Sequence, residues 1–176
     1  MTPSGVWRVV KKYAIMAGVP ELRVHDLRHT VLTRLVRELG WQATLPSEAE
    51  WEKAARGDQG QIFPWGDAPD PNAANYAEAG VGQTTAVGCF PAGASPYGCL
   101  DLAGNVWEWT RSAHKPYPYD ARDGREDLRG ISFLVMRGGG YDDHHTSLRC
   151  ACRSWFYLAG HFNDGGFRVA LSAAKM

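Results

Sequence analysis

Residues 137–169 read RGGGYDDHHTSLRCACRSWFYLAGHFNDGGFRV, with glycines near both ends. Consecutive glycines permit backbone conformations that other residues rarely adopt, so they mark turns at which this segment begins and ends. The 26 residues 141–166 contain no Lys, Glu, Gln or Met, although the chain has 21 of these residues. Average usage would place about three of them here. Aromatic and short polar side chains fill the segment instead, as in binding loops. The alternative is an ordinary buried segment whose aromatic residues pack in a core.

Residues 97–110, YGCLDLAGNVWEWT, precede this segment and contain a strand-like pattern. Val106 and Glu108 alternate with Trp107 and Trp109, so each pair is expected to point to its own face of a sheet. The pattern therefore predicts a strand that enters the C-terminal part of the fold.

Residues 45–57, LPSEAEWEKAARG, predict a short helix. Ser47 and Glu50 form a capping box, and Gly57 is the expected end of the helix. Pro, Gly and Asn punctuate the chain between this helix and the predicted strand, which favours loops. Only brief strands fit there, such as one at residues 85–90.

Composition and charge restrict the classes of function. Nineteen basic residues balance nineteen acidic ones, and a net charge near zero argues against a general nucleic-acid binder. The chain is 44% hydrophobic, which is enough for a real core. No apolar run approaches the roughly 20 residues that span a membrane, and no signal peptide is recognisable. The default expectation is a cytoplasmic protein, with surface or phage association as the alternative.

Residues 1–40 differ in character from the remainder. They hold seven of the 19 basic residues and two helical patterns. The phrase HDLRHT at residues 25–30 resembles the HxLRHT box of tyrosine recombinases (phage integrases), in which the residues matching His25 and Arg28 contact the scissile phosphate. No later segment matches that family's second histidine and nucleophilic tyrosine, and without the tyrosine no covalent intermediate forms. We therefore interpret residues 1–40 as a helical, recombinase-like remnant.

The motifs after residue 40 resemble those of formylglycine-generating-enzyme-type domains. LPSEAEWEKAARG, FPWG, YGCLDLAGNVWEWT, RGGG and GGFRV occur in that family's order. Five motifs in a fixed order are a specific signal. The resemblance implies an α+β, C-type-lectin-like (formylglycine-generating-enzyme-type) fold that is loop-rich. The predicted domains are the helical remnant, residues 1–40, and a C-type-lectin-like variable domain, residues 41–176.

The resemblance does not extend to the family's catalytic cysteines. Its enzymes use two copper-dependent cysteines between the RGG motif and the next arginine, and residues 141–148 contain none. Cys150 and Cys152 come after that arginine, and on a strand both would point the same way. They do not match the enzyme's pair, so the nucleophile of an oxidase is missing. Together with Cys89 and Cys99, they show no CxxC metal spacing, and we interpret all four as free thiols in a reducing compartment.

A subset of the family, the variable proteins of diversity-generating retroelements, is similar over the C-terminal frame. That frame reads RGGGY at 137–141, LRCA at 148–151 and GFR at 166–168, with Tyr141 where tryptophan is usual. In those systems an error-prone reverse transcriptase substitutes bases at template adenines. Randomised adenines in an AAY codon cannot produce Lys, Glu, Gln, Met or Trp. This restriction agrees with the absence of Lys, Glu, Gln and Met from residues 141–166. It requires Trp155 to be an unvaried position or to come from another codon.

The resemblance also implies a rigid frame with separate display positions. Surface substitutions change the free energy of unfolding by only about 0.5 kcal/mol, whereas core substitutions cost more, so varied side chains must stay off the core. The predicted frame anchors are Arg149, Ala151, Arg153, Phe167 and Val169. The predicted ligand-binding (variable) residues form the display segment and are Tyr141, Asp142, Asp143, His144, Ser147, Trp155, Phe156, Tyr157, Gly160, His161, Phe162, Asn163 and Asp164. The large aromatic residues at positions 155–157 and 162 are hot-spot candidates at about 2 kcal/mol each.

Two metal hypotheses arise. Enzymes of the family place a structural Ca²⁺ at the AGNVWEW segment, so the resemblance implies Asp101 and Glu108 as ligands, together with the carbonyl groups of Gly104 and Val106. Oxygen ligands suit calcium. The alternative is that the two carboxylates accept hydrogen bonds from loop amides. His144 and His145, with Asp142 and Asp143, are a weaker candidate, because neighbouring residues on a strand point in opposite directions and no further spaced ligands appear.

The interpretation that we favour from the sequence is a non-enzymatic ligand-binding protein that displays a hypervariable recognition surface. The second interpretation is a formylglycine-generating-type, sulfatase-activating oxidase, which the missing cysteine pair disfavours. The third is a degenerate DNA-binding fusion based on the basic helices of residues 1–40, which would bind DNA in a salt-sensitive manner. The sequence does not specify the ligand, an unknown protein or surface, because a diversified surface exists so that its ligand can change.

Overall fold

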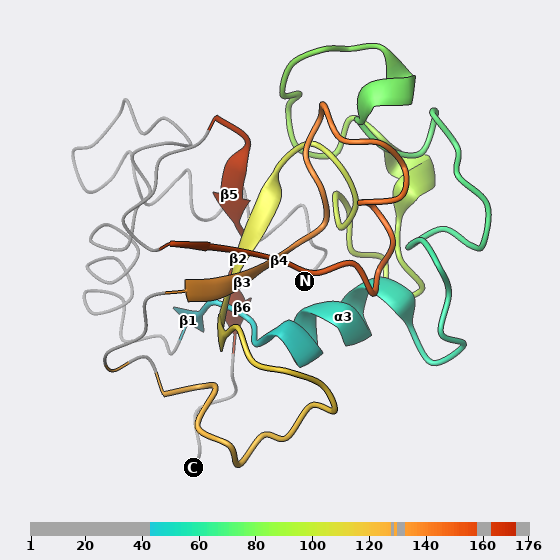
Figure 1. The fold of residues 1–176 in the computed structure, drawn as a ribbon. Coiled ribbons are helices and arrows are strands. Elements are labelled where there is room, and N and C mark those ends of the chain that lie inside the picture. Colours follow the sequence, from blue (N-terminus) through green and yellow to red (C-terminus); the bar gives the residue numbers. More distant parts are fainter. Residues whose placement is uncertain (1–42, 128, 130–132, 158–162, 172–176) are drawn as a thin grey trace. The chain divides into compact units, whose positions relative to one another are not determined.

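The structure is a computed structural model that describes residues 43–127, 129, 133–157 and 163–171. The chain divides into two compact units, one of Met1–Thr44 with Val169–Met176 and one of Leu45–Arg168. In the first unit, β1 (Ala43–Thr44) pairs antiparallel with β6 (Ala170–Leu171). The second unit holds the other described helices and strands (Figure 1).

The helix of the second unit is α3 (Glu48–Arg56). Its N-cap is Ser47, whose hydroxyl accepts a hydrogen bond from the Glu50 N–H at 3.2 Å, while the Glu50 carboxylate accepts one from the Ser47 N–H at 2.7 Å. Gly57 ends the helix with a φ of 62°, a left-handed value that glycine adopts without strain. The predicted helix and its capping box are therefore confirmed.

The central sheet of this unit has four strands in the order β4-β3-β2-β5. β2 (Trp107–Ala113) pairs antiparallel with β3 (Phe133–Arg137), and β3 pairs antiparallel with β4 (Ser154–Tyr157). β5 (Gly165–Phe167) runs parallel to β2 along its other edge. The sheet thus places β4, which carries three of the predicted display residues, at one end of the strand order.

Burial alternates along β2. Glu108 and Thr110 are buried, whereas Trp107 and Trp109 are half-buried, which confirms the period-two pattern expected from the sequence. The register with β3 shifts between Trp109 and Ala113, and such a bulge interrupts the alternation at the end of the strand.

Residues 58–106 form loops and two short 3₁₀ helices, η2 (Ala77–Ala79) and η3 (Pro91–Gly93). The strand expected at residues 85–90 was a wrong prediction, because this stretch forms a loop with a turn. The side chain of Asn105 explains the difference: its oxygen accepts from the Thr85 N–H at 2.8 Å, and its amide donates to the Thr85 carbonyl at 3.3 Å. The Thr85 backbone is satisfied by a side chain instead of a neighbouring strand.

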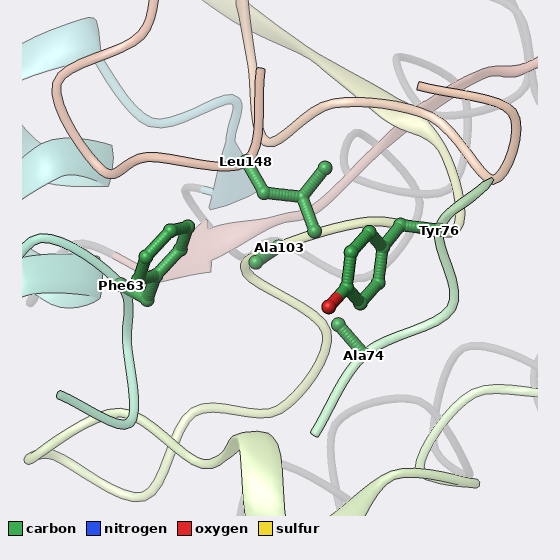
Figure 2. Close-up of a cluster of buried hydrophobic side chains, with 5 residues drawn as sticks. All are labelled: Phe63, Ala74, Tyr76, Ala103 and Leu148. Carbon is green, nitrogen blue, oxygen red and sulfur yellow. The ribbon is translucent and has the colours of Figure 1, made fainter. Parts of the chain in front are cut away.

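Two hydrophobic clusters fill the second unit. The first, shown in Figure 2, consists of Phe63, Ala74, Tyr76, Ala103 and Leu148. The second consists of Trp51, Ala55, Leu102 and Cys150. Leu148 and Cys150 have no exposed surface, so each cluster takes one fully buried side chain from the stretch between β3 and β4.

Charged side chains are also buried against α3. Glu48 is fully buried, and it accepts hydrogen bonds from Arg125 at 2.9 Å and from Arg153 at 2.7 and 2.9 Å. Glu52, one turn further along the helix, accepts from Arg137 at 2.5 Å. Glu48 and Glu52 of α3 thus bind arginines from three separate segments of the chain.

The predictions for residues 1–40 fall outside the described residues. They comprise the two helices, the recombinase-like box at residues 25–30 and the domain boundary after residue 40, all of which stay predictions. Within the described part of the chain, no helix is long and apolar enough to cross a membrane.

Replacing Glu48 with Gln is expected to lower the free energy of unfolding by about 3–5 kcal/mol, the usual cost of breaking a buried ion pair. The reason is that Arg125 and Arg153 would lose their shared carboxylate while their side chains stay 1% and 15% exposed. Urea denaturation followed by tryptophan fluorescence measures the loss. Asp127→Asn is the control, because its partner Arg129 is 90% exposed and the cost should stay below about 1 kcal/mol. Similar losses in the two variants would contradict the expectation.

Candidate ligand-binding surface

The display segment begins and ends beside the start of β2 (Figure 1). At its beginning, the Tyr141 N–H donates to the Asn105 carbonyl at 3.2 Å. At its end, the Asp164 carbonyl accepts from the Trp107 N–H at 2.7 Å. The two ends also meet directly, since a Cβ added to Gly140 would lie 2.4 Å from a carboxylate oxygen of Asp164. Main-chain hydrogen bonds therefore fix both ends of the segment to the sheet.

Large aromatic side chains are exposed along β4. Trp155 and Tyr157 are each 51% exposed, and Phe156 is 39% exposed. Successive residues of a strand point to opposite faces, so Trp155 and Tyr157 share one face and Phe156 lies on the other. The alternative interpretation is that these aromatic residues are fully buried in a core. The exposure of Trp155 and Tyr157 does not agree with it.

The other predicted display residues divide by exposure. Those that are exposed are Asp142, His144 and Asn163, and those that are half-buried are Tyr141, Ser147 and Asp164. Those outside the described residues are Gly160, His161 and Phe162.

Asp143 is tied to the scaffold, in contrast to the display role expected from the sequence. Its Oδ2 accepts hydrogen bonds from Trp107 Nε1 at 2.7 Å and from the Gly140 N–H at 2.8 Å. Its carbonyl accepts from the Ala77 N–H, at the start of η2, at 2.9 Å. Three donors from three segments hold this residue, so its geometry is that of a structural residue.

The two adjacent histidines turn toward one carboxylate. His145 Nδ1 lies 2.7 Å from Glu78 Oε1, and His144 Nδ1 lies 3.5 Å from the same oxygen. The hydrogen bond from His145 lowers the pKa of Glu78 to about 2. The histidines attach the beginning of the display segment to η2, and they are not arranged around a metal position.

Three carboxylates gather where the ends of the display segment meet. Asp142, Asp143 and Asp164 place oxygen atoms within 4.8 Å of one another. Burial, reinforced by repulsion from the other two carboxylates, raises the pKa of Asp164. Calcium takes about six to eight oxygen ligands, so three carboxylates alone form an acidic rim and not a complete calcium shell.

The calcium ligands predicted at Asp101 and Glu108 surround an arginine instead. Arg168 donates to both Glu108 carboxylate oxygens, at 2.5 and 2.8 Å, and to the Asp101 carbonyl at 2.8 Å. Trp51 Nε1 also donates to Glu108, at 2.7 Å. The Asp101 carboxylate accepts from the Gly88 N–H at 2.7 Å, as the loop-amide alternative expects. The guanidinium already supplies the positive charge among these oxygens, so this arrangement does not fit Ca²⁺.

The frame anchors differ in part from the prediction. Arg149 and Ala151 are exposed, whereas Leu148 and Cys150 beside them are fully buried. The chain turns at these residues, and the turn directs the side chains of Leu148 and Cys150 into the two hydrophobic clusters. Arg153 is held by its ion pair with α3, consistent with the anchoring role predicted for it.

The four cysteines are free. Cys150 and Cys152 lie before β4, outside any described strand, so the common orientation expected on a strand is not seen. Burial raises the pKa of Cys150 to about 12 and also raises that of Cys152. Because the thiolate is the reactive form, both thiols are poor nucleophiles at neutral pH.

Two residues outside the display segment pack against its exposed aromatic rings, and sequence reasoning missed both. The His114 ring stacks on Trp155, with ring centroids 4.2 Å apart. Phe133 is 48% exposed and packs edge-on against Tyr157 at 5.7 Å. Burial and the nearby Arg153 guanidinium lower the pKa of His114, so the imidazole is neutral at neutral pH. These contacts follow from strand pairing, for which the sequence offers only the alternation within each strand.

Comparison with known proteins identifies the family. The family described as "Sulfatase-modifying factor enzyme 1-like domain" matches residues 6–173. The chain therefore belongs to this family. The match begins upstream of residue 41, where the recognisable motifs start.

The relatives include proteins named as inactive and proteins named as enzymes. The chain is 43% identical over 142 residues to inactive C-alpha-formylglycine-generating enzyme 2 of Mus musculus, covering 74% of this chain and 44% of that protein. It is 38% identical over 141 residues to hercynine oxygenase of Mycolicibacterium smegmatis, covering 73% and 33%. It is 31% identical over 170 residues to formylglycine-generating enzyme of Mus musculus, covering 83% and 44%. The chain thus spans less than half the length of each of these relatives.

Solved structures share the fold. Treponema denticola variable protein 1 matches with a TM-score of 0.62 and 26% identity, covering 72% of this chain and 46% of that one. PvdO from Pseudomonas aeruginosa matches with a TM-score of 0.67 and 24% identity, covering 80% and 57%, which shows a likeness of fold alone. With the family match, these structures confirm the formylglycine-generating-enzyme-type fold expected from the motifs.

Asp143→Ala is expected to lower the free energy of unfolding by about 1–3 kcal/mol, because the Trp107 Nε1 and the Gly140 N–H would lose their acceptor. Asp142→Ala removes the same group from an exposed position next to it and should change stability by no more than about 0.5 kcal/mol. Chemical denaturation of both variants measures the difference. If Asp142→Ala were the more damaging change, the structural role of Asp143 would be refuted.

Cys150 is expected to resist alkylation in the folded protein. Iodoacetamide at pH 8 should modify exposed Cys89 at least about tenfold faster than Cys150, whose thiol is buried and protonated. Peptide mass spectrometry at timed intervals measures both rates, and urea should make them similar. Rapid modification of Cys150 in the native protein would instead indicate an activated thiol, as an oxidase requires.

Proposed function

We propose that this chain is a non-enzymatic ligand-binding protein whose C-terminal segment, on a C-type-lectin-like fold, carries a recognition surface diversified by a retroelement. The observation that carries the proposal is the half-exposure of Trp155 and Tyr157 on a strand that follows the buried residues Leu148 and Cys150. Large aromatic rings held outside the core by a rigid strand are typical of contact residues in binding surfaces.

The separation of displayed residues from supporting residues favours diversification. Asp142, His144, Trp155 and Tyr157 are exposed, whereas main-chain hydrogen bonds and a few buried side chains hold the segment in place. Substitutions at exposed positions usually cost no more than about 0.5 kcal/mol. The composition of residues 141–166 and the similarity to Treponema denticola variable protein 1 support the same proposal.

The alternative is an oxidase of the formylglycine-generating type, since relatives named formylglycine-generating enzyme match this chain. The sequence of residues 141–148 contains no cysteine, and burial keeps Cys150 and Cys152 protonated. The 43% identity to a relative named inactive also fits a non-catalytic role. Both the thiol chemistry and this relative therefore favour binding over catalysis.

The proposed partner is a protein or surface ligand and not a nucleic acid. The display residues that the structure describes are aromatic, acidic or short and polar, and none of them is Lys or Arg. A DNA-binding role would rest on the basic residues of the 1–40 segment. A fluorescence titration with duplex DNA at low salt tests that role, and an unchanged signal would exclude it.

Deep sequencing of this gene across a population of its source organism tests the diversification. Nonsynonymous differences are expected to concentrate in codons for exposed positions such as Asp142, His144 and Tyr157, at adenines of a matching template repeat. Leu148 and Cys150 should stay constant, because truncating a buried apolar residue costs about 2–5 kcal/mol.

Differences spread evenly along the gene, or the lack of any template repeat, would reject the retroelement. The chain would then be a fixed binding domain, because the exposure of the rings on β4 does not depend on how the gene varies.

A further inference from the structure

We propose that the recognition surface extends beyond the display segment to His114, Tyr117 and Phe133, and that its partner is a folded protein with an apolar patch. The three residues, together with Trp155 and Tyr157, form what we call the aromatic face. This inference rests on the proposed ligand-binding function. It adds fixed residues to that surface and commits to one class of ligand.

Strand pairing places three of these side chains on one face of the sheet. Phe133 lies opposite Tyr157, and Val135 lies opposite Trp155. Directly paired residues point to the same face, as do residues two apart on one strand. Phe133, Trp155 and Tyr157 therefore share a face, and about half of each side chain is exposed.

His114 and Tyr117 join this face from the segment after β2. The His114 ring stacks on Trp155 with an interplanar angle of 23°. The Arg153 guanidinium lies 4.4 Å from the centre of the Tyr117 ring and donates to the Lys115 carbonyl at 3.1 Å. Because Arg153 directly precedes β4, these contacts hold the segment around residues 114–117 against the beginning of that strand. Tyr117 remains 51% exposed, so its ring adds to the aromatic face.

The charges beside the aromatic face are compensated. Arg153 shares the Glu48 carboxylate, and Lys115 lies 3.8 Å from Asp123. A nucleic acid would require an excess of basic side chains, and the described neighbours of this face offer none. Half-exposed aromatic rings beside paired charges are instead the features of protein–protein hot spots. The chemistry of the face therefore matches an apolar patch on a protein.

Fixed residues on this face would make binding less dependent on the variable positions. The stack with His114 restricts the indole of Trp155, and the edge contact with Phe133 restricts the phenol of Tyr157. Side chains that are already ordered lose less entropy when a partner binds. His114 and Phe133 are thus positioning residues for the two rings as well as contact residues.

Display libraries of the full 176-residue chain test the inference. Each library is randomised at the exposed display residues Asp142, His144 and Asn163 and keeps Tyr157. Each is selected on yeast against immobilised lysozyme as a folded-protein probe, with dextran and duplex DNA as parallel probes. One library keeps His114 and Phe133, and the other carries His114→Ala with Phe133→Ala. The best clones of the first library are expected to bind lysozyme about tenfold more tightly or better, as the loss of hot-spot contacts predicts.

Two further libraries separate recognition from folding. Val87→Ala with Ile62→Ala removes side chains that are 51% and 44% exposed elsewhere, and this library should match the intact one. His114→Phe with Phe133 intact keeps an aromatic ring against Trp155, and this library should bind nearly as tightly as the intact one and more tightly than the double alanine library. Thermal unfolding of selected clones must show matched midpoints, so that affinity and stability are read separately.

Each outcome decides a different point. Equal affinities from the intact and the alanine libraries would refute the extension of the surface to His114 and Phe133. Stronger enrichment on dextran or on duplex DNA than on lysozyme would refute the class of partner. If no library gives binders to any probe, the proposed ligand-binding function fails, and this inference fails with it.

Discussion

The buried carboxylate of Glu48 is the interaction on which the arrangement of the second unit depends. A charged group without exposed surface is stable only when opposite charge and hydrogen bonds surround it. Arg125 and Arg153 supply both, from positions 77 and 105 residues further along the chain. Together the three side chains join the start of α3, the segment before β3 and the residue that leads into β4. Removing Glu48 would take a carboxylate from both arginines at once and would leave Arg125 with Asp123. The ion pair between Glu48 and Arg153 positions the residue that precedes β4, and it thereby helps to position Trp155 and Tyr157 on that strand.

The display segment is held in place by a different kind of contact. Main-chain hydrogen bonds fix the ends of the display segment, and a main-chain bond does not depend on which side chain the residue carries. Some positions use their side chains for support: Asp143 binds the indole of Trp107, His145 binds Glu78, and Arg153 binds Glu48. Leu148 and Cys150 fill the two hydrophobic clusters. Exposure and structural support therefore fall on different residues of one short segment, sometimes on immediate neighbours such as Asp142 and Asp143. Such a division lets a surface change while its support does not.

The features that the sequence predicted are those with local signals. The capping box of α3 needs only Ser47 and Glu50, three positions apart, and the alternation along β2 is visible within a few residues. The features that it missed depend on distant partners. Glu108 meets Arg168, 60 residues away, and no local pattern shows that a guanidinium rather than calcium would lie among these oxygens. The stack of His114 on its tryptophan likewise follows from the position of β4 in the sheet. Composition indicated an exposed, aromatic segment, but it could not tell a displayed aspartate from a structural one.

The meeting of Tyr141 and Asp164 beside β2 has a consequence for the length of the chain between them. The display segment carries β4, and the parts of it outside that strand are connections whose ends the fold already holds together. The entropy lost on closing such a loop grows only with the logarithm of its length, about 0.6 kcal/mol for each doubling. Residues added or removed outside β4 and outside the turn that carries Leu148 and Cys150 would change the length of this segment while leaving the pairing of β4 with β3 intact. By this estimate, a change in the length of a connection outside β4 costs little free energy of folding.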